Sequence, residues 1–200
     1  MFKLYQNSYS QAGQESFVLS VLGGKKGGFF LEIGAFDGKE LSNTFLLENE
    51  FQWKGVALEI QTKRANKYNR TRSNPCYAQD ALTTDYLNLL KINQAPHVID
   101  FLQIDIEPAS NSLKCLKLMP YENYRFNIIT FEHDYYSNPN NQQVKNEAYN
   151  FLNHLGYKRI VDNVCNKGNP FEDWYVHNSL LQDNNILGTL KNLEWTSIFR

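Results

Sequence analysis

Two acids lie within and beside a turn that carries two glycines, close to the start of the chain. The four apolar residues around Glu32 predict a short buried strand, and Gly34 and Gly38 follow it as Gly-x-x-x-Gly. A strand, a glycine turn and a helix together open a nucleotide-type α/β site. The alternative is an ordinary turn whose glycines serve backbone geometry alone. Glu32 and Asp37 favour a binding site, since a turn of this kind should otherwise be neutral.

The same acids indicate which ligand suits the turn. A dinucleotide site has the pattern G-x-G-x-x-G, which lets bare backbone approach a pyrophosphate. Here Ala35 or Phe36 occupies the position of the second glycine, and Asp37 would repel phosphate. S-Adenosylmethionine carries a sulfonium and an ammonium at that end and has no phosphate. We therefore expect S-adenosylmethionine as the cofactor.

A further acid, Glu59, closes the second expected strand, 55–59. Its distance along the chain from Gly34 is near that of the ribose-binding acid in nucleotide sites. The alternative is a solvated acid at a strand end. The apolar run before Glu59 and the polar helix expected after it, 62–70, favour the ribose-binding role.

Five ionisable residues end the next two strands, which we expect over 98–107 and 127–134: Asp105, Glu107, Glu132, His133 and Asp134. These strands should be neighbours, so their ends would converge beside the expected position of the methyl group of S-adenosylmethionine. A hydroxyl acceptor must lose a proton, and histidine has the pKa best suited to accept it. We expect His133 as the base, with Asp105 and Glu132 also catalytic.

The roles of these acids stay open in part. Asp105 either orients His133 or holds a divalent cation such as Mg²⁺ together with Glu132, because carboxylate oxygens suit magnesium. Glu107 and Asp134 are expected to cap a helix or to meet solvent.

The remaining pattern predicts an α/β fold of one domain, residues 1–200, with a Rossmann-like, mostly parallel sheet flanked by helices. The connection between the expected strands 157–164 and 170–176 is too short for a crossover helix, so they form a C-terminal antiparallel hairpin. A weak strand is expected over 75–78. Helices are expected over 11–22 with Ser10 as N-cap, 42–51, 62–70, from Thr83 or Thr84 to Leu90, from Ser110, and over 142–155.

The tail, 180–200, has helical spacing at Ile186, Leu190 and Leu193 and then a short strand. Trp174 and His177 lie at and beyond the last hairpin strand, where a sugar could stack, so we expect both to contact substrate. Tyr175 is expected in the core.

The composition excludes some partners. The 200 residues carry a net charge of −1 and no basic stripe, and no Asn/Asp-Pro-Pro-aromatic motif occurs, so we expect no nucleic-acid substrate. No apolar run reaches the length of a membrane span, and we expect no membrane partner. Three widely spaced cysteines fit neither a disulfide framework nor a zinc site, which favours a reducing, cytoplasmic location.

Several motifs together resemble the FkbM-type methyltransferases. They span nearly the whole chain: YSQxGQE from Tyr9, FLEIGAxDG from Phe30, LSNT from Leu41, WKG from Trp53, IDIE from Ile104, ITFEH from Ile129 and FEDWYVH from Phe171. The resemblance implies a Rossmann-like, S-adenosylmethionine-dependent O-methyltransferase that acts on a sugar, a glycan or a related small hydroxylated metabolite. One departure is Phe36, where the family often has asparagine.

The resemblance also implies a set of cofactor-binding residues. The turn on the methionine side is formed by Glu32, Gly34, Asp37 and Gly38. Glu59 accepts hydrogen bonds from the ribose hydroxyls, and the adenine lies against Gln79, Asp80 and Ala81. The start of the first crossover helix either holds the methionine carboxylate or is simply N-capped; its residues are Ser42, Asn43 and Thr44.

Two other functions are compatible with such a fold. One is a nicotinamide-dependent oxidoreductase, which Asp37 and the missing phosphate turn disfavour. The other is a non-catalytic module that binds nucleosides or partners, because a fold does not determine a function.

Overall fold

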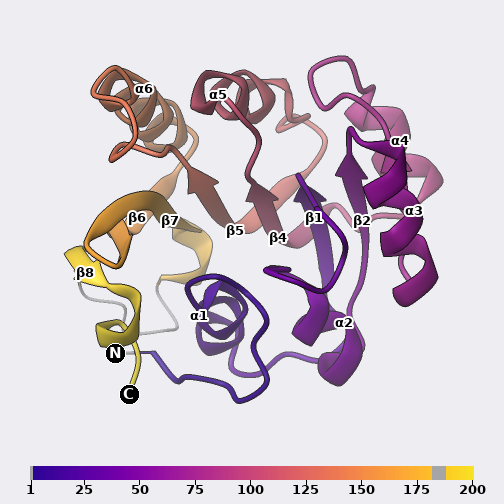
Figure 1. The fold of residues 1–200 in the computed structure, drawn as a ribbon, viewed down its shortest axis with the longest axis horizontal. Helices are drawn as coiled ribbons and strands as arrows, with labels where there is room; N and C mark the ends of the chain where they lie inside the picture. Colours follow the sequence, from indigo (N-terminus) through magenta and orange to yellow (C-terminus); the bar gives the residue numbers. More distant parts are fainter. Residues whose placement is uncertain (1, 182–187) are drawn as a thin grey trace.

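The computed structural model describes residues 2–181 and 188–200, and its centre is one eight-stranded sheet (Figure 1). The strand order is β3-β2-β1-β4-β5-β7-β6-β8. The strands are β1 (Phe29–Ile33), β2 (Lys54–Glu59), β3 (Cys76–Ala78), β4 (Val98–Ile104), β5 (Arg125–Glu132), β6 (Tyr157–Asn166), β7 (Asn169–His177) and β8 (Leu190–Glu194). Strands β1 to β5 are parallel, and β7 runs antiparallel to both β5 and β6. The predicted α/β architecture with a C-terminal antiparallel hairpin is confirmed.

Helices cover both faces of this sheet, with α5 and α6 above it and α1 and α2 below it in Figure 1. The helices are α1 (Gln14–Val21), α2 (Phe45–Phe51), α3 (Thr62–Thr71), α4 (Tyr86–Ile92), α5 (Ala109–Leu118) and α6 (Asn141–His154). Apolar side chains of α4, α5 and α6 pack in one cluster and those of α1 and α2 in another. Burial of both faces explains why the parallel strands read as continuous apolar runs.

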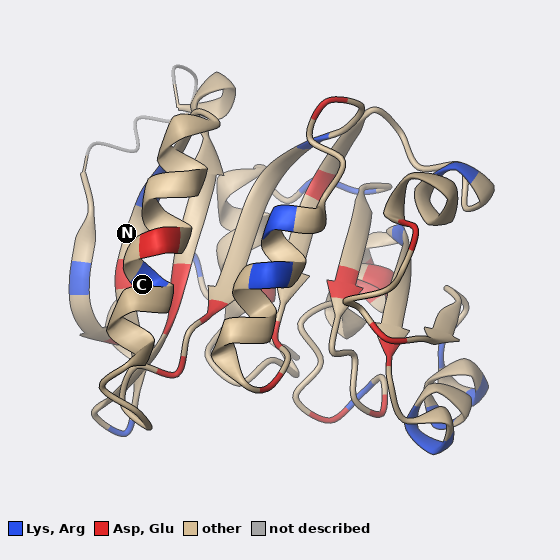
Figure 2. Cartoon of the chain, turned by 90° about the horizontal axis from the view of Figure 1, so that it is seen from above, with Lys and Arg blue, Asp and Glu red and all other residues tan. Residues whose placement is uncertain are grey.

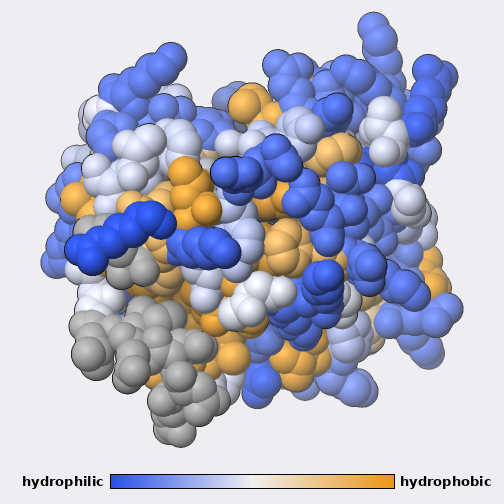
Figure 3. Space-filling view, turned by 90° about the horizontal axis from the view of Figure 1, so that it is seen from below, coloured by the Kyte–Doolittle hydropathy of each residue, from blue (hydrophilic) through white to orange (hydrophobic). Residues whose placement is uncertain are grey.

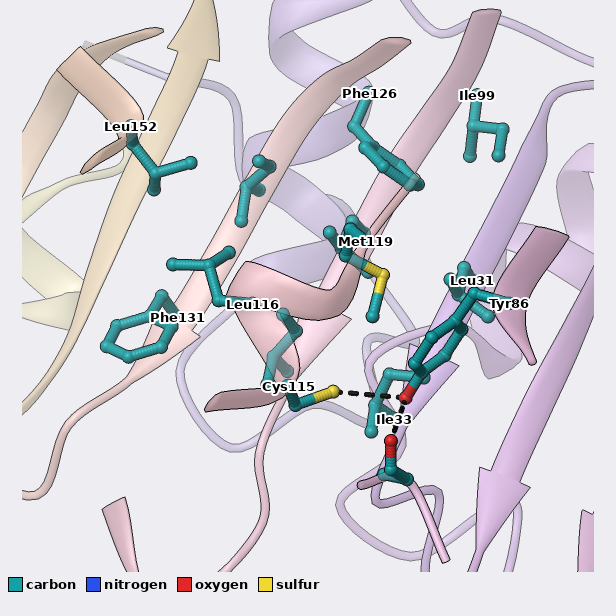
Figure 4. Close-up of a cluster of buried hydrophobic side chains, with 14 of the residues drawn as sticks. Leu31, Ile33, Tyr86, Ile99, Cys115, Leu116, Met119, Phe126, Phe131 and Leu152 are labelled. Atoms are coloured by element: carbon teal, nitrogen blue, oxygen red, sulfur yellow. Dashed lines mark hydrogen bonds between the residues drawn. The ribbon is translucent and has the colours of Figure 1, made fainter. Parts of the chain in front are cut away.

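The core under α4 and α5 also contains the polar hydroxyl of Tyr86, which has hydrogen-bond partners (Figure 4). The Tyr86 hydroxyl donates to the carbonyl oxygen of Ala81 at 2.8 Å and lies 3.1 Å from Cys115 Sγ. Leu31 and Phe126 surround this pair in the same cluster. The contact ties α4 and α5 to the turn after β3, which is one wall of the site described below.

The predicted start of the first helix is wrong. The helix begins at Gln14, and its N-cap is Gly13 in the left-handed region, with φ of 77°. Ser10, predicted as the N-cap, instead forms an isolated β-bridge with Leu41. Residues 11–13 form bends, and the helix starts only after them.

Two other helix starts differ from the prediction because local caps set them. Helix α2 begins at Phe45 rather than at residue 42, since Ser42 Oγ accepts the backbone N–H groups of Thr44 and Phe45. Helix α4 is capped by Asp85, which accepts from the N–H of Asn88, and not by Thr83 or Thr84.

The tail also differs from the prediction. Leu190 and Leu193 belong to strand β8, which pairs in parallel with β6. The free edge of the hairpin offers backbone hydrogen bonds, and these outweigh helical spacing in a short segment. A 3₁₀ turn, Trp195–Ser197, occupies the place of the predicted last strand, and Ile186 lies outside the described residues.

The surface that carries α1 and α2 is mixed in character. Hydrophobic residues are distributed among hydrophilic ones on this face (Figure 3). None of the helices within residues 2–181 and 188–200 combines the length and apolar character needed to span a bilayer. Cys76, Cys115 and Cys165 are all buried and free.

Candidate functional site

A cavity of about 500 Å³ opens at the carboxyl ends of β1, β2, β4 and β5. The strand order reverses between β1 and β4, which is where open α/β sheets bind ligands. Acidic residues lie at the tips of several strand arrows and in the loops that follow them (Figure 2). The predicted site residues that line the cavity are Glu32, Gly34, Ser42, Asn43, Glu59, Gln79, Asp80, Ala81, Asp105 and Glu132.

Gly34 brings three strand ends together. Its φ is 85°, and a Cβ at this position would overlap the carbonyl oxygen of Asp105. The N–H groups of Gly34 and Ala35 both donate to the Leu58 carbonyl, at 2.9 and 3.1 Å. Only glycine allows this backbone approach, so β1, β2 and β4 can end around one space.

The carboxylate of Glu59 is held rigidly at the edge of the cavity. Its Oε2 accepts the N–H of Phe36 at 3.1 Å, and its Oε1 accepts the N–H of Gln61 at 2.8 Å. The residue is only 6% exposed. Each oxygen keeps a second lone pair, so Glu59 can accept two hydroxyl hydrogen bonds without moving.

The turn after β3 forms the wall next to Glu59. Asp80 Oδ1 accepts the N–H of Leu82 at 2.8 Å, which fixes this turn. Facing it are two lining residues that the sequence did not single out as ligands. Phe36 has a φ of 52°, and the Arg64 guanidinium lies 4.2 Å from its ring centre. A planar group could be enclosed between these walls.

Three predicted cofactor residues do not line the cavity. Asp37 binds Lys67 Nζ at 2.6 Å and accepts the N–H groups of Lys39 and Glu40. Burial alone would raise the pKa of Asp37, but the hydrogen bonds from Lys67, Lys39 and Glu40 and the Lys67 charge together lower it. Gly38 packs against the Tyr68 ring, and Thr44 is fully buried. In this structure Asp37, Gly38 and Thr44 shape the turn.

At the start of α2, the N–H groups from Asn43 to Leu46 all have acceptors within the protein. Glu32 Oε1 accepts the N–H of Asn43 at 3.3 Å, and Ser42 caps the next two residues. Glu15 Oε1 accepts the N–H of Leu46 at 2.6 Å. Of the two roles predicted for this helix start, the structure therefore supports N-capping.

Glu32 itself is buried at the base of the cavity. Its Oε2 accepts the Thr44 hydroxyl at 2.7 Å, and the same hydroxyl receives a hydrogen bond from Arg72. Burial raises the pKa of Glu32, while the nearby Arg72 charge opposes that rise. Arg72 lies behind Glu32, outside the cavity lining, and Glu32 binds Ser42 and Asn43 from the base of the cavity.

Asp105 and Glu132 form a carboxyl pair in the cavity. Their side chains are hydrogen-bonded to each other. Burial raises the pKa of Asp105 to about 6 and raises the pKa of Glu132 well above its ordinary value. Burial and the repulsion between the two carboxyls therefore favour one proton shared by the pair at neutral pH.

The structure contradicts the role predicted for His133. Its side chain is fully buried and does not line the cavity. Nδ1 lies 3.1 Å from the N–H of Tyr135, and Nε2 lies 3.3 Å from Asp173 Oδ1. Nδ1 must accept the backbone N–H, so Nε2 carries the proton and donates to Asp173. No lone pair is left to deprotonate an acceptor.

The substrate contacts predicted for Trp174 and His177 are also wrong. Trp174 is fully buried, with its ring 4.6 Å from that of Phe17, and its Nε1 donates to Glu172. His177 packs on Tyr157 at the opposite end of β7. Because β7 runs antiparallel to β5, the start of β7, and not its end, lies at the cavity edge. Tyr175 is in the core, as predicted.

Sequence reasoning missed the polar residues that back the Asp105–Glu132 pair. Glu172 lies opposite Glu132 in the register between β5 and β7, and it accepts a hydrogen bond from Gln14 Nε2 at 2.9 Å. Burial raises the pKa of Glu172 to about 8. Gln11 and Gln14, just before and at the start of α1, line the cavity. The feature of the sequence that could have revealed Glu172 is its position, since it is an acid near the start of the strand that runs antiparallel to β5.

The structure does not favour the predicted metal role. Within residues 2–181 and 188–200, no three His, Cys, Asp or Glu side chains are grouped so that they could hold a metal ion. Asp105 and Glu132 are instead hydrogen-bonded to each other.

No protein-family model and no curated protein matches the chain. Solved structures do. An O-methyltransferase from Bacillus cereus in complex with SAH is 18% identical, with a TM-score of 0.60 over 87% of this chain and 84% of that one. A putative O-methyltransferase from Klebsiella pneumoniae is 16% identical, with a TM-score of 0.60 over 88% and 84%. TrmK from M. capricolum, also with SAH, is 13% identical, with a TM-score of 0.52 over 80% and 66%. The chain has the Rossmann-like fold of S-adenosylmethionine-dependent methyltransferases.

Proposed function

We propose that this protein is an S-adenosylmethionine-dependent O-methyltransferase of the FkbM type, acting on a hydroxyl of a sugar, a glycan or a related small metabolite. The observation that carries the proposal is the cavity itself. It joins Glu59, a fixed carboxylate with two free lone pairs, to the ionisable pair Asp105–Glu132 in one space. The three free cysteines accord with the cytoplasmic location that we expect.

The residues of the cavity fit the cofactor. Glu59 would hold the ribose hydroxyls, and Asp80 with its neighbours Gln79 and Ala81 would lie along the adenine. Gly34 keeps the space at the end of β1 free of side chains. The carboxylates at the ends of β1 and β4 suit a sulfonium and an ammonium group. When bound, S-adenosylmethionine supplies an electrophilic methyl group, and the residues around it must align an acceptor with that group.

Asp105 replaces His133 as the base. Above a pH of about 6, Asp105 is ionised and can accept the proton of an acceptor hydroxyl in the cavity. The pKa of Glu132 is raised well above its ordinary value by burial, which favours leaving the shared proton on Glu132 and a hydrogen bond from it that orients Asp105. Glu172, behind the pair, is buried and accepts a hydrogen bond from Gln14 on the α1 side at 2.9 Å.

The alternatives use the same cavity differently. A nicotinamide cofactor brings a pyrophosphate, and Arg64 is the single Lys or Arg on the cavity wall formed by the described residues, against six acids. Those charges disfavour the pyrophosphate. A non-catalytic nucleoside-binding module would need Glu59 and Asp80 but has no need of a carboxyl pair with a shared proton.

Two measurements separate these functions. Thermal shifts with S-adenosylhomocysteine and with NAD distinguish the cofactors, and we expect a rise in Tm with S-adenosylhomocysteine alone. Transfer of a labelled methyl group to a panel of hydroxylated sugars and metabolites, with Asp105→Asn as the control, tests catalysis. Binding without transfer to any hydroxylated compound would favour the non-catalytic module, and stabilisation by NAD alone would favour the oxidoreductase.

A further inference from the structure

The segment before α1, residues 6–11, lies along one rim of the cavity and has no buried side chain. The chain is anchored on both sides of it, because Phe2 packs against an aromatic ring of α1, with 4.9 Å between ring centres, and α1 itself is buried along most of its length. Within the segment, Gln11 lines the cavity, and Ser10 forms a β-bridge with Leu41, which also lines it. Residues 6–11 thus form a strap along the cavity rim that is anchored at both ends.

One carboxyl group fastens this strap from the protein interior. Glu15, in the first turn of α1, is fully buried. Its Oε2 accepts the Ser8 hydroxyl and the N–H of Tyr9, both at 3.0 Å, and its Oε1 accepts the N–H of Leu46 in α2 at 2.6 Å. A single side chain therefore joins α1, α2 and the strap. When Glu15 is ionised, these are hydrogen bonds to a charged group, which are stronger than neutral ones.

Other side-chain contacts of the strap are closer to solvent. The ring of Tyr9 packs edge-on against that of Phe45, with 4.7 Å between ring centres, but Tyr9 is 38% exposed. Asn7 Nδ2 donates to Glu50 Oε1 at 3.1 Å on the exposed surface. A segment with few buried apolar contacts opens locally at a low cost in free energy. The hydrogen bonds to Glu15 therefore carry much of the attachment of the strap to the core.

The strap and the turn after β1 close the same side of the cavity, since the bridge between Ser10 and Leu41 joins them. We infer that Glu15 is a positioning residue that holds the strap closed over the cofactor, and that the cofactor enters and its product leaves when the strap lifts. The inference rests on the proposed function, from which it takes the cofactor, and adds a closing element to the same site. Both rate constants of exchange should then scale with the fraction of molecules in which the strap is open.

The test measures the association and dissociation rate constants of S-adenosylhomocysteine by surface plasmon resonance. It is done at pH 8, where Glu15 is largely ionised, because burial raises its pKa to about 7. Glu15→Gln keeps the shape of the side chain and replaces one acceptor oxygen by an amide nitrogen. One hydrogen bond to a charged group corresponds to a factor of about 10 to 150 in an equilibrium. We expect both rate constants to rise at least about 10-fold, while their ratio, the dissociation constant, stays nearly the same.

Two further variants locate the effect. Ser8→Ala removes one hydrogen bond from Glu15 Oε2 at a position outside the core, and it should raise both rate constants in the same way. This variant decides the question if Glu15→Gln does not fold. Ser20→Ala is the matched control, because Ser20 Oγ binds the backbone N–H and carbonyl of Lys3, outside the strap. It should leave both rate constants unchanged.

A weaker affinity with an unchanged association rate constant would show that Glu15 only shapes the cavity wall, and it would overturn the inference. Wild-type rate constants in both Glu15→Gln and Ser8→Ala would overturn it as well.

If S-adenosylhomocysteine does not bind the wild-type protein, the proposed function fails, and hydrogen exchange followed by NMR then tests the strap without a ligand. The N–H of Tyr9, which Glu15 accepts, should exchange faster in Ser8→Ala than in the wild type or in Ser20→Ala. Equal exchange in the three proteins would show that Glu15 does not fasten a strap.

Discussion

The acids of the cavity and the acids of the β6–β7 hairpin are partnered in opposite ways. In the hairpin, Arg159 binds Asp173 at 3.0 Å and Asp162 at 3.1 Å. Lys145 of α6 binds Asp162 at 2.6 Å, and His133 donates to Asp173. Although burial would raise it, the pKa of Asp173 is lowered by the His133 hydrogen bond and by these cations. Every carboxylate there has a partner within the protein.

The cavity has the same kind of residue without the same partners. Asp105 and Glu132 share a proton, and burial raises the pKa of both. The acids of the hairpin have their partners within the protein and need no ligand. The Asp105–Glu132 pair, by contrast, can still bind a positive charge of a ligand or exchange a proton with it. The contrast favours the cavity, rather than the hairpin, as the site of the chemistry that we propose.

The largest expected effect follows from removing the base. Asp105→Asn keeps the side-chain shape but cannot accept a proton. We expect methyl transfer to fall by a factor of about 10² to 10⁴, while S-adenosylhomocysteine still binds. For the wild-type protein, transfer should increase as the pH rises through about 6, because Asp105 must be ionised. Steady-state kinetics between pH 5 and 8 measure both effects.

Near wild-type transfer by Asp105→Asn would contradict this assignment. The parallel variant His133→Asn tests the alternative base, and it should retain transfer per folded molecule, since His133 does not reach the cavity.

In the hairpin, removing a carboxylate should reduce stability and leave methyl transfer nearly unchanged. Asp173→Asn removes the carboxylate partner of His133 and one of the two carboxylates that pair with the mostly buried Arg159. We expect the free energy of unfolding to drop by about 3–5 kcal/mol, as for other broken buried pairs. Chemical denaturation measures this loss. Transfer per folded molecule should stay within a few-fold of wild type, and a selective loss of kcat at full stability would place Asp173 in the site.

A smaller effect tests the ionisation of Glu172, which lies behind the Asp105–Glu132 pair. The pKa of Glu172 is raised by burial from 4.5 to about 8 in the folded state. The folded protein therefore holds a proton that the unfolded chain loses above pH 4.5, and stability declines as the pH rises from about 4.5 to 8. Glu172→Gln should flatten this decline by at most about 1.4 kcal/mol per pH unit.

The measurement is the free energy of unfolding at several pH values, with Glu122→Gln as an exposed control. The amide oxygen can still accept from Gln14 and Trp174, so the variant should be more stable than wild type at pH 8. A slope equal to that of wild type would show that Glu172 is ionised in the folded protein.

The sequence predicted the sheet well because strands that are buried on both faces have continuous apolar runs in the sequence, as in β1 and β5. It also predicted the acids at the ends of β1, β2, β4 and β5, since parallel strands end at one edge. What it could not predict was non-local. Glu15 of α1 accepts a hydrogen bond from the N–H of Leu46 in α2, and only the fold brings those two residues together.

The two failures in the site have one origin. Whether His133 or Glu132 faces the cavity depends on the exact residue where β5 ends, because neighbouring side chains point to opposite faces. Trp174 and His177 were placed at the cavity from their position near the end of a strand. The reversal of β7 moves that end to the far edge of the sheet and brings Glu172 to the cavity instead.

The central claim is that this cavity binds S-adenosylmethionine through Glu59. It is tested most directly by calorimetric titration of S-adenosylhomocysteine into the wild-type protein and into Glu59→Ala. The variant loses two charge-assisted hydrogen bonds, each worth about 1.5–3 kcal/mol. We therefore expect tight binding by the wild type and a loss of at least about 100-fold in the folded variant. Equal affinity in the two proteins, or no binding by the wild type, would contradict the account.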